Sequence, residues 1–221
     1  MEFQRARTDE QRSQRRRHIL DVTAAMLTEM PVAKLSLNEL SRRVGLAKAN
    51  VLRYFESREA ILLDLLISEG QDWVAELERT VPRGDGTPRE RGDRLAQVLA
   101  TSLARRPVLC DLMSNQAAVL EHNISTEVAI QHKYAALQNM QPLFRLVQQY
   151  LPELGMEGAA RLVETTLLTA TAVWPYSRPS PALQAAYDSD PALAALCMDF
   201  TDQVRRTAEV TTSGLLARQE H

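Results

Sequence analysis

The chain has 221 residues, of which 45% are hydrophobic and 24% are charged, and its formal net charge is −2. This length supports one large or two modest domains with a buried core, and 8 glycines with 10 prolines are too few for a glycine-rich β fold. No apolar run reaches the ~18 residues of a membrane span, and the arginine-rich start lacks the apolar segment of a secretory signal. We therefore expect a cytoplasmic protein whose Cys110 and Cys197 are reduced, buried thiols.

The charge is unevenly distributed along the chain. Residues 1–60 hold 12 Arg and Lys against 8 Asp and Glu, a balance of +4, whereas the rest holds 14 against 20, a balance of −6. A basic head on an acidic body indicates a polyanionic partner for the head. The signal is weak by itself, because runs of charge are usually only solvated helix faces.

Apolar residues recur at the helical period of 3.6 throughout, without sustained alternation of period two, so the pattern predicts an all-α protein. Helices are expected over 9–30, 37–44, 48–55 and 57–77. Pro31 ends the first of them. Ser36 and Glu39 form a capping box for the second, and Gly45 can adopt the left-handed turn that follows it.

The segment 81–93 is dense in glycine, proline and charge and is read as a break. Five more helices are expected after it, over 92–104, 107–121, 125–150, 156–174 and 191–217, which gives about nine helices in all. The segment 177–191 is predicted to be a second loop with some local helix. The sequence contains no internal repeat.

The stretch from 37 to 55 has the pattern of a helix-turn-helix motif, in which two short helices pack through apolar side chains across a glycine-containing turn. In that arrangement the second helix lies in the major groove of DNA and its first residues meet base edges. The side chains predicted to face inward are Leu37, Leu40, Val44, Leu46, Val51 and Phe55.

The second helix of this motif carries residue types suited to DNA. Lys48 can donate to guanine O6 and N7, and Asn50 can pair with adenine. Arg58 begins the next helix, and helix N-termini attract anions. The alternative is three packed helices whose cations are only solvated. The predicted DNA-binding residues are Ser36, Arg42, Arg43, Lys48, Ala49, Asn50, Arg53, Tyr54 and Arg58.

Residues 16–65 resemble the N-terminal domain of the TetR family of bacterial transcriptional repressors, whereas the remainder resembles the family only in its helical layout. The resemblance rests on ILDVTA (19–24), SLNEL (36–40), GL (45–46), YF (54–55) and SREAI (57–61). The chain departs from the family pattern at Ala47, where a capping serine is frequent, and the loss of such a cap costs roughly 0.5–2 kcal/mol. Asn50 stands where threonine is frequent, which bears on base preference, and Leu52 stands where a common tyrosine would supply a phosphate contact. Met30-Pro31 replaces the usual glycine-aromatic corner.

The resemblance implies a helix-turn-helix DNA-binding domain at 1–60 and a larger helical effector-binding and dimerisation domain at 61–221. It implies a homodimeric, nucleoid-associated repressor that binds a palindromic operator in double-stranded DNA. A small-molecule effector is expected to release the dimer by shifting the fourth helix. The last two long helices are expected to pair as a four-helix bundle. The predicted interface residues are Val163, Leu167, Ala170, Leu196, Phe200, Val204, Thr207 and Thr211.

Polar residues that interrupt apolar helix stripes are candidates for an effector pocket. Gln116 and Lys133 are such interruptions, and Pro142 removes a backbone donor and is expected to kink its helix and open space beside it. A mostly hydrophobic effector would suit a cavity of this kind. The alternatives are that the methionines and aromatic residues form the core and that Lys133 extends to the surface. The predicted pocket residues are Trp73, Met113, Gln116, Lys133, Leu137, Met140, Phe144 and Trp174.

The sequence shows little that is typical of an enzyme. Its 4 histidines are scattered, and it contains neither a Glu-x-x-His motif nor a glycine-rich phosphate loop. We expect no catalytic residues, metal or cofactor, although a spatial constellation remains the weaker alternative. A helix-turn-helix activator or an architectural DNA-binding protein also remains open, because operator position decides between activation and repression.

Overall fold

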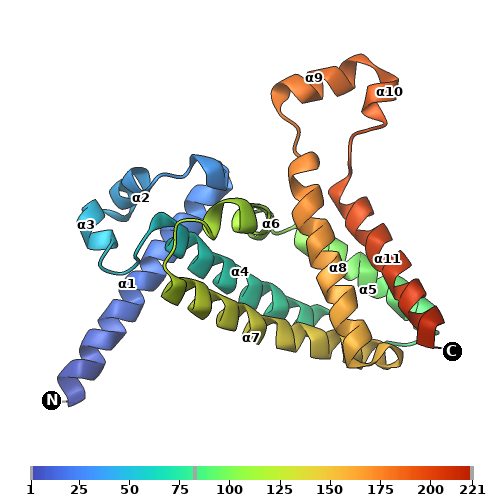
Figure 1. The fold of residues 1–221 in the computed structure, drawn as a ribbon, viewed down its shortest axis with the longest axis horizontal. Helices are drawn as coiled ribbons and strands as arrows, with labels where there is room; N and C mark the ends of the chain where they lie inside the picture. Colours follow the sequence, from blue (N-terminus) through green and yellow to red (C-terminus); the bar gives the residue numbers. More distant parts are fainter. Residues whose placement is uncertain (1, 82–83, 220–221) are drawn as a thin grey trace. The chain divides into compact units, whose positions relative to one another are not determined.

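The computed structural model describes residues 2–81 and 84–219, with side chains described from Glu10 to Arg218 within those ranges. The described residues form eleven α-helices, α1 to α11, with three short helical turns and no strand (Figure 1). This confirms the predicted all-α fold class. No helix among the described residues is long and apolar enough to cross a bilayer. The chain divides into two compact units, one made of residues 1–69 and 115–136 and the other of residues 70–114 and 137–221.

The first unit contains the predicted helix-turn-helix. Its elements are α1 (Glu2–Glu29), η1 (Val32–Lys34), α2 (Leu37–Val44), α3 (Lys48–Val51), the start of α4 (Arg58–Thr80), the π-helical turn η2 (Gln116–Leu120) and the start of α7 (Thr126–Tyr150). The Ser36 hydroxyl accepts a hydrogen bond from the Glu39 amide at 3.2 Å and caps α2. Gly45 ends α2 at φ 73°, a left-handed conformation that favours glycine. The Ser36 cap and the Gly45 turn were correctly predicted, but only the Ser36 half of the predicted capping box is seen, through the Glu39 amide.

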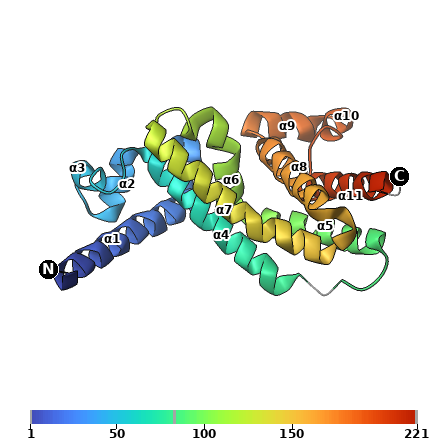
Figure 2. The same cartoon turned by 60° about the horizontal axis from the view of Figure 1, so that its bottom comes forward.

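The second unit is a helical layer built around α11. It contains the rest of α4 and α7 together with α5 (Pro88–Ala104), α6 (Pro107–Asn115), η3 (Pro152–Leu154), α8 (Gly155–Tyr176), α9 (Pro181–Ser189), α10 (Pro191–Ala194) and α11 (Phe200–Gln219). Helix α11 packs against α5 and α8 (Figure 2). A Cβ added at Gly92 would lie 2.6 Å from the Thr212 methyl carbon, so this glycine permits the close approach of α5 to α11.

The single helix predicted over 191–217 is wrong. Helix α10 ends at Ala194, and α11 begins only at Phe200 after a non-helical connection. The Asp199 carboxylate accepts a hydrogen bond from the Asp202 amide at 2.6 Å and caps the new helix. Cys197 lies in the connection and is exposed, so its predicted burial is also wrong, whereas Cys110 is buried as predicted.

Two other predicted helices differ in extent. The one predicted over 48–55 ends at Val51 and continues as turns to Tyr54. The one predicted over 107–121 is α6 followed by η2, in which the helix widens. The two additional α-helices have other origins: α9 forms within the predicted loop, and the helix predicted over 191–217 is divided into α10 and α11, so eleven α-helices are found among the described residues where about nine were expected.

The second unit offers a test of its packing at Trp73, whose indole N–H donates to the Ser102 hydroxyl at 2.9 Å in a buried environment. Ser102→Ala should leave this N–H buried without a partner and lower the free energy of unfolding by roughly 1–3 kcal/mol. Urea denaturation followed by circular dichroism measures the change. Ser13→Ala, on the exposed face of α1, should leave the midpoint unchanged, and an equal loss in both variants would contradict this role of Ser102.

Candidate functional site

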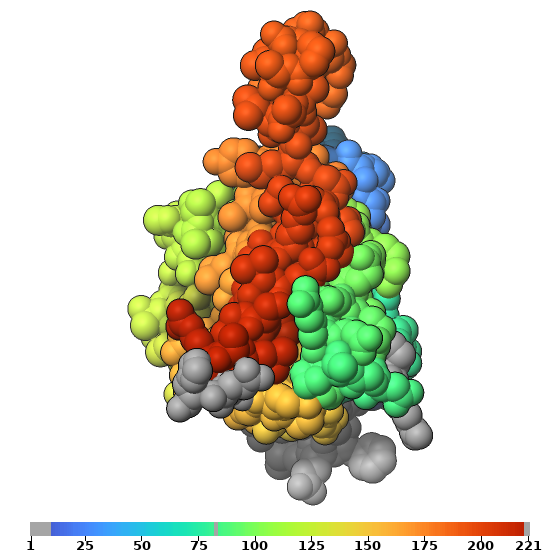
Figure 3. Space-filling model, turned by 90° about the vertical axis from the view of Figure 1, so that its right-hand side faces the viewer, coloured from blue at the N-terminus to red at the C-terminus, as the bar shows by residue number. Residues whose placement is uncertain are grey.

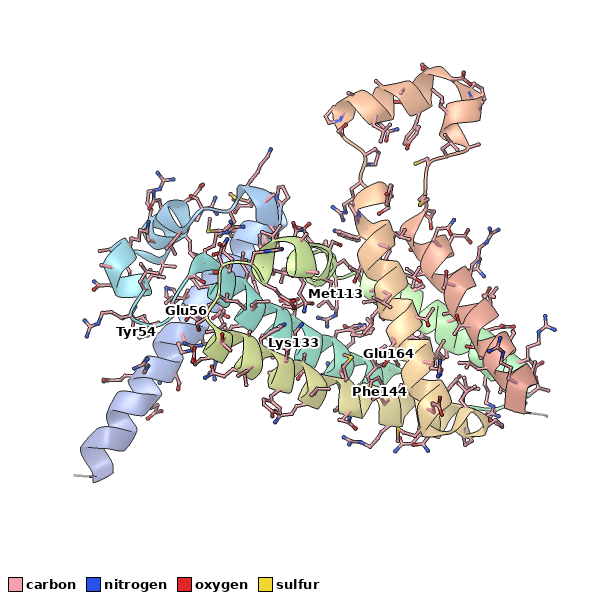
Figure 4. All side chains as sticks on the ribbon, viewed as in Figure 1. Tyr54, Glu56, Met113, Lys133, Phe144 and Glu164 are labelled. Carbon is pink, nitrogen blue, oxygen red and sulfur yellow. The ribbon has the colours of Figure 1, made fainter. Side chains whose placement is uncertain are left out.

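The recognition segment, Lys48–Tyr54, has one exposed and one buried side. Val51 is fully buried, as is nearly all of Phe55 just beyond the segment. Lys48, Asn50 and Arg53 are exposed, as is Ala49, and Tyr54 is half-buried. Figure 4 shows Tyr54 on the connection that leads from α3 to α4. The cationic and amide side chains therefore face away from the core of this unit, as major-groove contact requires.

Helix α3 does not secure its own ends. Its N-cap is Ala47, whose methyl side chain cannot accept a hydrogen bond, and only the Ala47 carbonyl supports the first turn, through the Asn50 and Val51 amides at 2.8 and 3.2 Å. The far end is held by Arg16 of α1. Its guanidinium donates to the Tyr54 carbonyl, pairs with Asp64 and lies 4.1 Å from the ring centre of Phe55.

Three of the other predicted DNA-binding residues have partners within the head. Ser36 caps α2. Arg43 forms a two-pronged ion pair with Glu29, with its closest nitrogen–oxygen distance at 2.6 Å. Arg58 donates to the Val32 carbonyl at 2.9 Å and lies 3.4 Å from Glu59. Arg42 remains exposed beside Glu39. Contact of any of these residues with DNA remains a prediction.

A basic hollow that the sequence interpretation missed lies between α1 and the recognition segment. Its volume is about 670 Å³, and it is lined by Gln11, Arg12, Gln14, Arg15, His18, Arg53 and Tyr54. Arg12 and Arg15 are three residues apart on α1 and therefore share a helix face. The arginine run at 15–17 was read only as bulk charge, although its helical spacing could have indicated this face.

A second group of polar residues links the turn η2 to α7 within the first unit. Glu121 follows η2, and one of its carboxylate oxygens accepts from the Gln116 amide at 2.8 Å and from the Lys133 ammonium at 2.6 Å. The same amide nitrogen of Gln116 lies 3.2 Å from His132 Nε2. Figure 4 shows Lys133 on α7. Gln116 and Lys133, both predicted from the sequence, therefore meet through Glu121, and His132 is an addition.

The hydrogen bonds of this cluster fix the protonation of His132. Since the Gln116 amide nitrogen is a donor, His132 Nε2 must accept, which leaves the ring proton on Nδ1. The reverse orientation of the Gln116 amide would set its oxygen against the Glu121 carboxylate. His132 is only 6% exposed, and its Nδ1 has no hydrogen-bond partner among the described residues. A buried donor without an acceptor is costly in a folded protein, so His132 Nδ1 is a candidate contact for an oxygen acceptor.

The charges of the cluster follow from the same contacts. Burial raises the pKa of Glu121, but hydrogen bonds from Lys133 and Gln116 outweigh it, so the pKa is lowered and the carboxylate stays ionised. Burial lowers the pKa of His132, and the charge of Lys133 adds to this effect, against opposing contributions from Glu121 and Asp64. The imidazole therefore stays neutral at neutral pH.

Sequence-family comparison covers both parts of the chain. The model for bacterial regulatory proteins of the tetR family matches residues 19–65. The model for the tetracyclin repressor-like C-terminal domain matches residues 68–219, more than half of the chain. The chain belongs to the TetR family. The resemblance predicted from the head residues is confirmed, and it extends to the body.

Individual relatives of this TetR-family chain are more distant. It is 26% identical over 119 residues to the HTH-type transcriptional repressor KstR of Mycolicibacterium smegmatis, covering 54% of this chain and 58% of that protein. It is 27% identical over 114 residues to the nucleoid occlusion factor SlmA of Idiomarina loihiensis, covering 52% and 58%. The chain thus matches less than two thirds of the length of either relative. It is a transcriptional regulator with a repressor among its relatives, and the proteins of its family are regulators and not enzymes.

Solved structures support the same fold. A TetR transcriptional regulator from Rhodococcus sp. RHA1 matches with a TM-score of 0.55 and 15% identity over 91% of this chain and 97% of that one. A putative TetR-family regulator from Mesorhizobium loti matches with a TM-score of 0.56 and 14% identity over 94% and 97%. At these identities the likeness concerns the helical architecture alone.

The remaining predicted pocket residues of this TetR-family regulator all belong to the second unit, and a pocket shared by them stays a prediction. In the second unit Trp73 binds Ser102, and Trp174 packs edge-on against Phe200 at a ring distance of 5.1 Å. Leu137 is exposed, and Met113, Met140 and Phe144 are half-buried. Helix α7 continues through Pro142, and a hollow of about 500 Å³ does lie beside that proline. None of the predicted pocket residues lines it; its walls are Glu78, Val81, Gly84, Pro142, Arg145, Leu146, Gln149 and Tyr150.

Half of the predicted dimer-interface residues need correction. Val163, Ala170, Phe200 and Val204 are buried in the chain's own second unit and are not available to a partner. The apolar stripe that they form was correctly read as a packing face, but the face packs within one chain, around α5, α8 and α11. Leu167, Thr207 and Thr211 are half-buried, and Leu196 is exposed. Any contact of these four with a second chain remains a prediction.

The lowered pKa of His132 predicts a pH dependence of stability. Near pH 6.5, the usual value, the unfolded chain takes up a proton that the folded cluster resists, so the free energy of unfolding falls as the pH drops below this value. His132→Gln should therefore lose less stability than wild type between about pH 7.5 and about pH 5.5. Denaturant midpoints at the two pH values measure this difference. His18→Gln, at an exposed site on α1, should behave as wild type, and equal slopes in all three proteins would contradict the burial argument.

Proposed function

We propose that this regulator is a ligand-responsive repressor that binds a palindromic operator as a homodimer and is released by a small, mostly hydrophobic effector. The observation that carries the DNA-binding part is the two-sided recognition segment, with Val51 and Phe55 buried and Lys48, Asn50 and Arg53 exposed. A segment that served only the core would not present its first turn in this way. A repressor of this kind works at the nucleoid in the cytoplasm.

The exposed residues divide by role. Lys48 and Asn50 lead the segment, where base edges are met, so they are proposed to read sequence. Arg53 shares the basic hollow with Arg12 and Arg15 of α1, and this hollow is proposed to receive backbone phosphates. An activator would use the same contacts at a different operator position. The repressor assignment is favoured by the KstR relative, which is a repressor.

Two kinds of variant separate these roles in binding selections against random duplex DNA at two salt concentrations. Lys48→Ala and Asn50→Ala should each relax the preferred base at one position of both half-sites, at a cost of about 1–3 kcal/mol for that base. Arg12→Ala and Arg15→Ala should weaken all sequences alike and reduce the salt slope by about one each per head. Arg89→Ala, exposed on α5 and outside the hollow, is the control. Unchanged sequence preference in the Lys48→Ala, Asn50→Ala double variant would refute the proposed reading head.

The homodimer is proposed to form through the outward faces of α8 and α11. Leu168 on α8 and Val210 on α11 are 71% and 72% exposed, which is unusual for large apolar side chains within ordered helices. Ala172 on α8 and Ser213, Gly214 and Ala217 on α11 are also exposed, and small residues let helices approach closely. Two such faces related by a two-fold axis can bury each other. Two heads then present recognition segments to half-sites about one helical turn apart.

The effector is proposed to bind at the polar cluster of the first unit, with an oxygen acceptor placed on His132 Nδ1. Gln116 and Lys133 already bind Glu121, and the buried polar atom of the cluster without a hydrogen-bond partner is His132 Nδ1. An apolar molecule with a carbonyl group satisfies this donor without bringing a second charge into a buried site. Bound there, the effector is proposed to act on α7. Ser125 caps the start of this helix, and its amide nitrogen and hydroxyl donate to the Glu56 carboxylate at 2.6 and 2.7 Å.

A panel of aromatic ketones, aromatic carboxylic acids and medium-chain fatty acids tests this site by release of labelled operator DNA. His132→Phe keeps an aromatic ring but lacks the donor. The variant should bind an active compound about tenfold or more weakly than wild type, while its operator affinity stays unchanged. Gln116→Leu should also weaken the binding of the compound, because the His132 ring loses the contact with Gln116 that orients it. Lys34→Ala, an exposed site outside the cluster, is the control. Equal release of wild type and His132→Phe by every active compound would rule out His132 as the anchor.

A further inference from the structure

The segment between α8 and α11 forms a projecting hairpin, here called the arm, residues 179–199. Its helices α9 and α10 bury none of their residues, and every residue from Ser180 to Asp199 is exposed or half-buried in the isolated chain. In the space-filling view of Figure 3 the arm stands clear of α8 and α11. The arm therefore contributes almost nothing to the core of its own unit.

The arm is helical despite this lack of burial. The Ser180 hydroxyl accepts from the Leu183 amide at 3.3 Å and caps α9, and the Asp190 carboxylate accepts from the Ala192 amide at 2.7 Å and caps α10. Gln184 binds Asp188 at 2.8 Å one turn along α9, and α9 and α10 pack against each other. A preformed hairpin loses little conformational entropy when it binds, so it is suited to docking.

The surface of the arm is apolar where a solvated linker would be charged. Asp188 and Asp190 are the only charged residues between 179 and 198. Four large apolar side chains are exposed along the arm: Leu183, Leu193, Leu196 and Met198. A contiguous patch of this kind on an ordered element marks an interaction site.

We propose that the arm packs against a second copy of this chain and clasps the homodimer. This inference rests on the proposed dimer, because the arm continues directly from the two helices whose outward faces are exposed. Leu168 and Tyr176 on α8 precede the arm in the chain and Val210 on α11 follows it, so exposed large apolar side chains occur on all three elements. In a two-fold arrangement the same surface meets its copy, and both arms dock at once.

The length of the arm agrees with this occupant. The nine residues of α9 span roughly 14 Å, whereas the axes of packed helices lie about 8–10 Å apart. Helix α9 is therefore longer than the distance between two packed helices. When a second copy packs on α8 and α11, an arm of this length can reach beyond the copy's nearest helix. Leu196, predicted from the sequence as an interface residue, lies on the arm with 64% exposure and takes part in this contact.

The chain carries its own reporter for this contact. Cys197 lies at the base of the arm and is exposed in the isolated chain, whereas Cys110 is buried. Burial raises the pKa of the Cys110 thiol to about 12, so it reacts slowly with thiol reagents. The fast phase of labelling by Ellman's reagent in the full-length wild-type protein therefore measures the exposure of Cys197.

The labelling rate is to be measured over a range of protein concentrations, with mass from light scattering at each concentration. The fast phase should slow at least tenfold as monomer becomes dimer, because the docked arm covers Cys197. A dimer that forms while Cys197 keeps the monomer rate would overturn the arm proposal and leave the α8 and α11 interface standing. A chain that stays monomeric at every concentration would overturn both, and operator selection tests DNA binding separately.

Variants of the arm supply the second readout. Leu183→Lys and Leu196→Lys should each weaken self-association about tenfold or more and restore fast labelling at concentrations where wild type is protected. The circular dichroism spectrum and monomer unfolding should not change, because neither side chain is buried within its own chain. Ile130→Lys, at a 51% exposed isoleucine on α7 outside the arm, is the matched control. Self-association that is equally insensitive to all three substitutions would contradict the clasp.

Discussion

The recognition segment cannot hold its own conformation, and the functional interpretation of this protein depends on what holds it. Helix α3 has four residues and a capping position occupied by Ala47, well below the length at which a helix is stable alone. Burial of Val51 and Phe55 fixes one side of the segment. Arg16 fixes its end by contacting the Tyr54 carbonyl, Asp64 and the Phe55 ring.

Arg16 also joins three elements that come from different parts of the head. It lies on α1, its acceptor follows α3, and its ionic partner lies on α4. The orientation of the exposed Lys48 and Asn50 is therefore tied to α4 by a side chain that itself need not touch DNA. The same first unit contains His132, whose pKa is affected by the charge of Asp64. Asp64 thus affects His132 of the polar cluster directly and is joined to the end of the recognition segment through Arg16.

The sequence predicted the head well because its determinants are local. A capping serine at Ser36, a left-handed glycine at Gly45 and the helical spacing of buried residues each act within one or two turns. The body was less predictable because its determinants are not local. In the helix predicted over 191–217, the apolar residues Leu196 and Phe200 kept helical spacing across the break, so the capping signal of Asp199 was overlooked and one helix was predicted where the chain has two.

The predicted pocket shows the same limit. Interruptions of apolar stripes identified Gln116 and Lys133, and both do belong to one polar cluster. They were taken as free ligand-binding groups, although Glu121 satisfies both. His132 was missed because its burial and its unpartnered nitrogen depend on which residues surround it in space, and no spacing rule reports that.

In the second unit, α8 and α11 each have one buried face and one exposed face. The inward faces of α8 and α11 are filled by Val163, Ala170 and Val204, so the unit has a core of its own. Leu168 and Val210 face outward and lie outside that core, so burying them against a second chain, as proposed, would be favourable. The arm has no buried face at all: its helices have side-chain caps of their own, and none of their residues is buried. Apart from Leu137 on α7, the large apolar side chains exposed among the described residues of this unit lie on α8, the arm and α11, the elements proposed to meet a second copy.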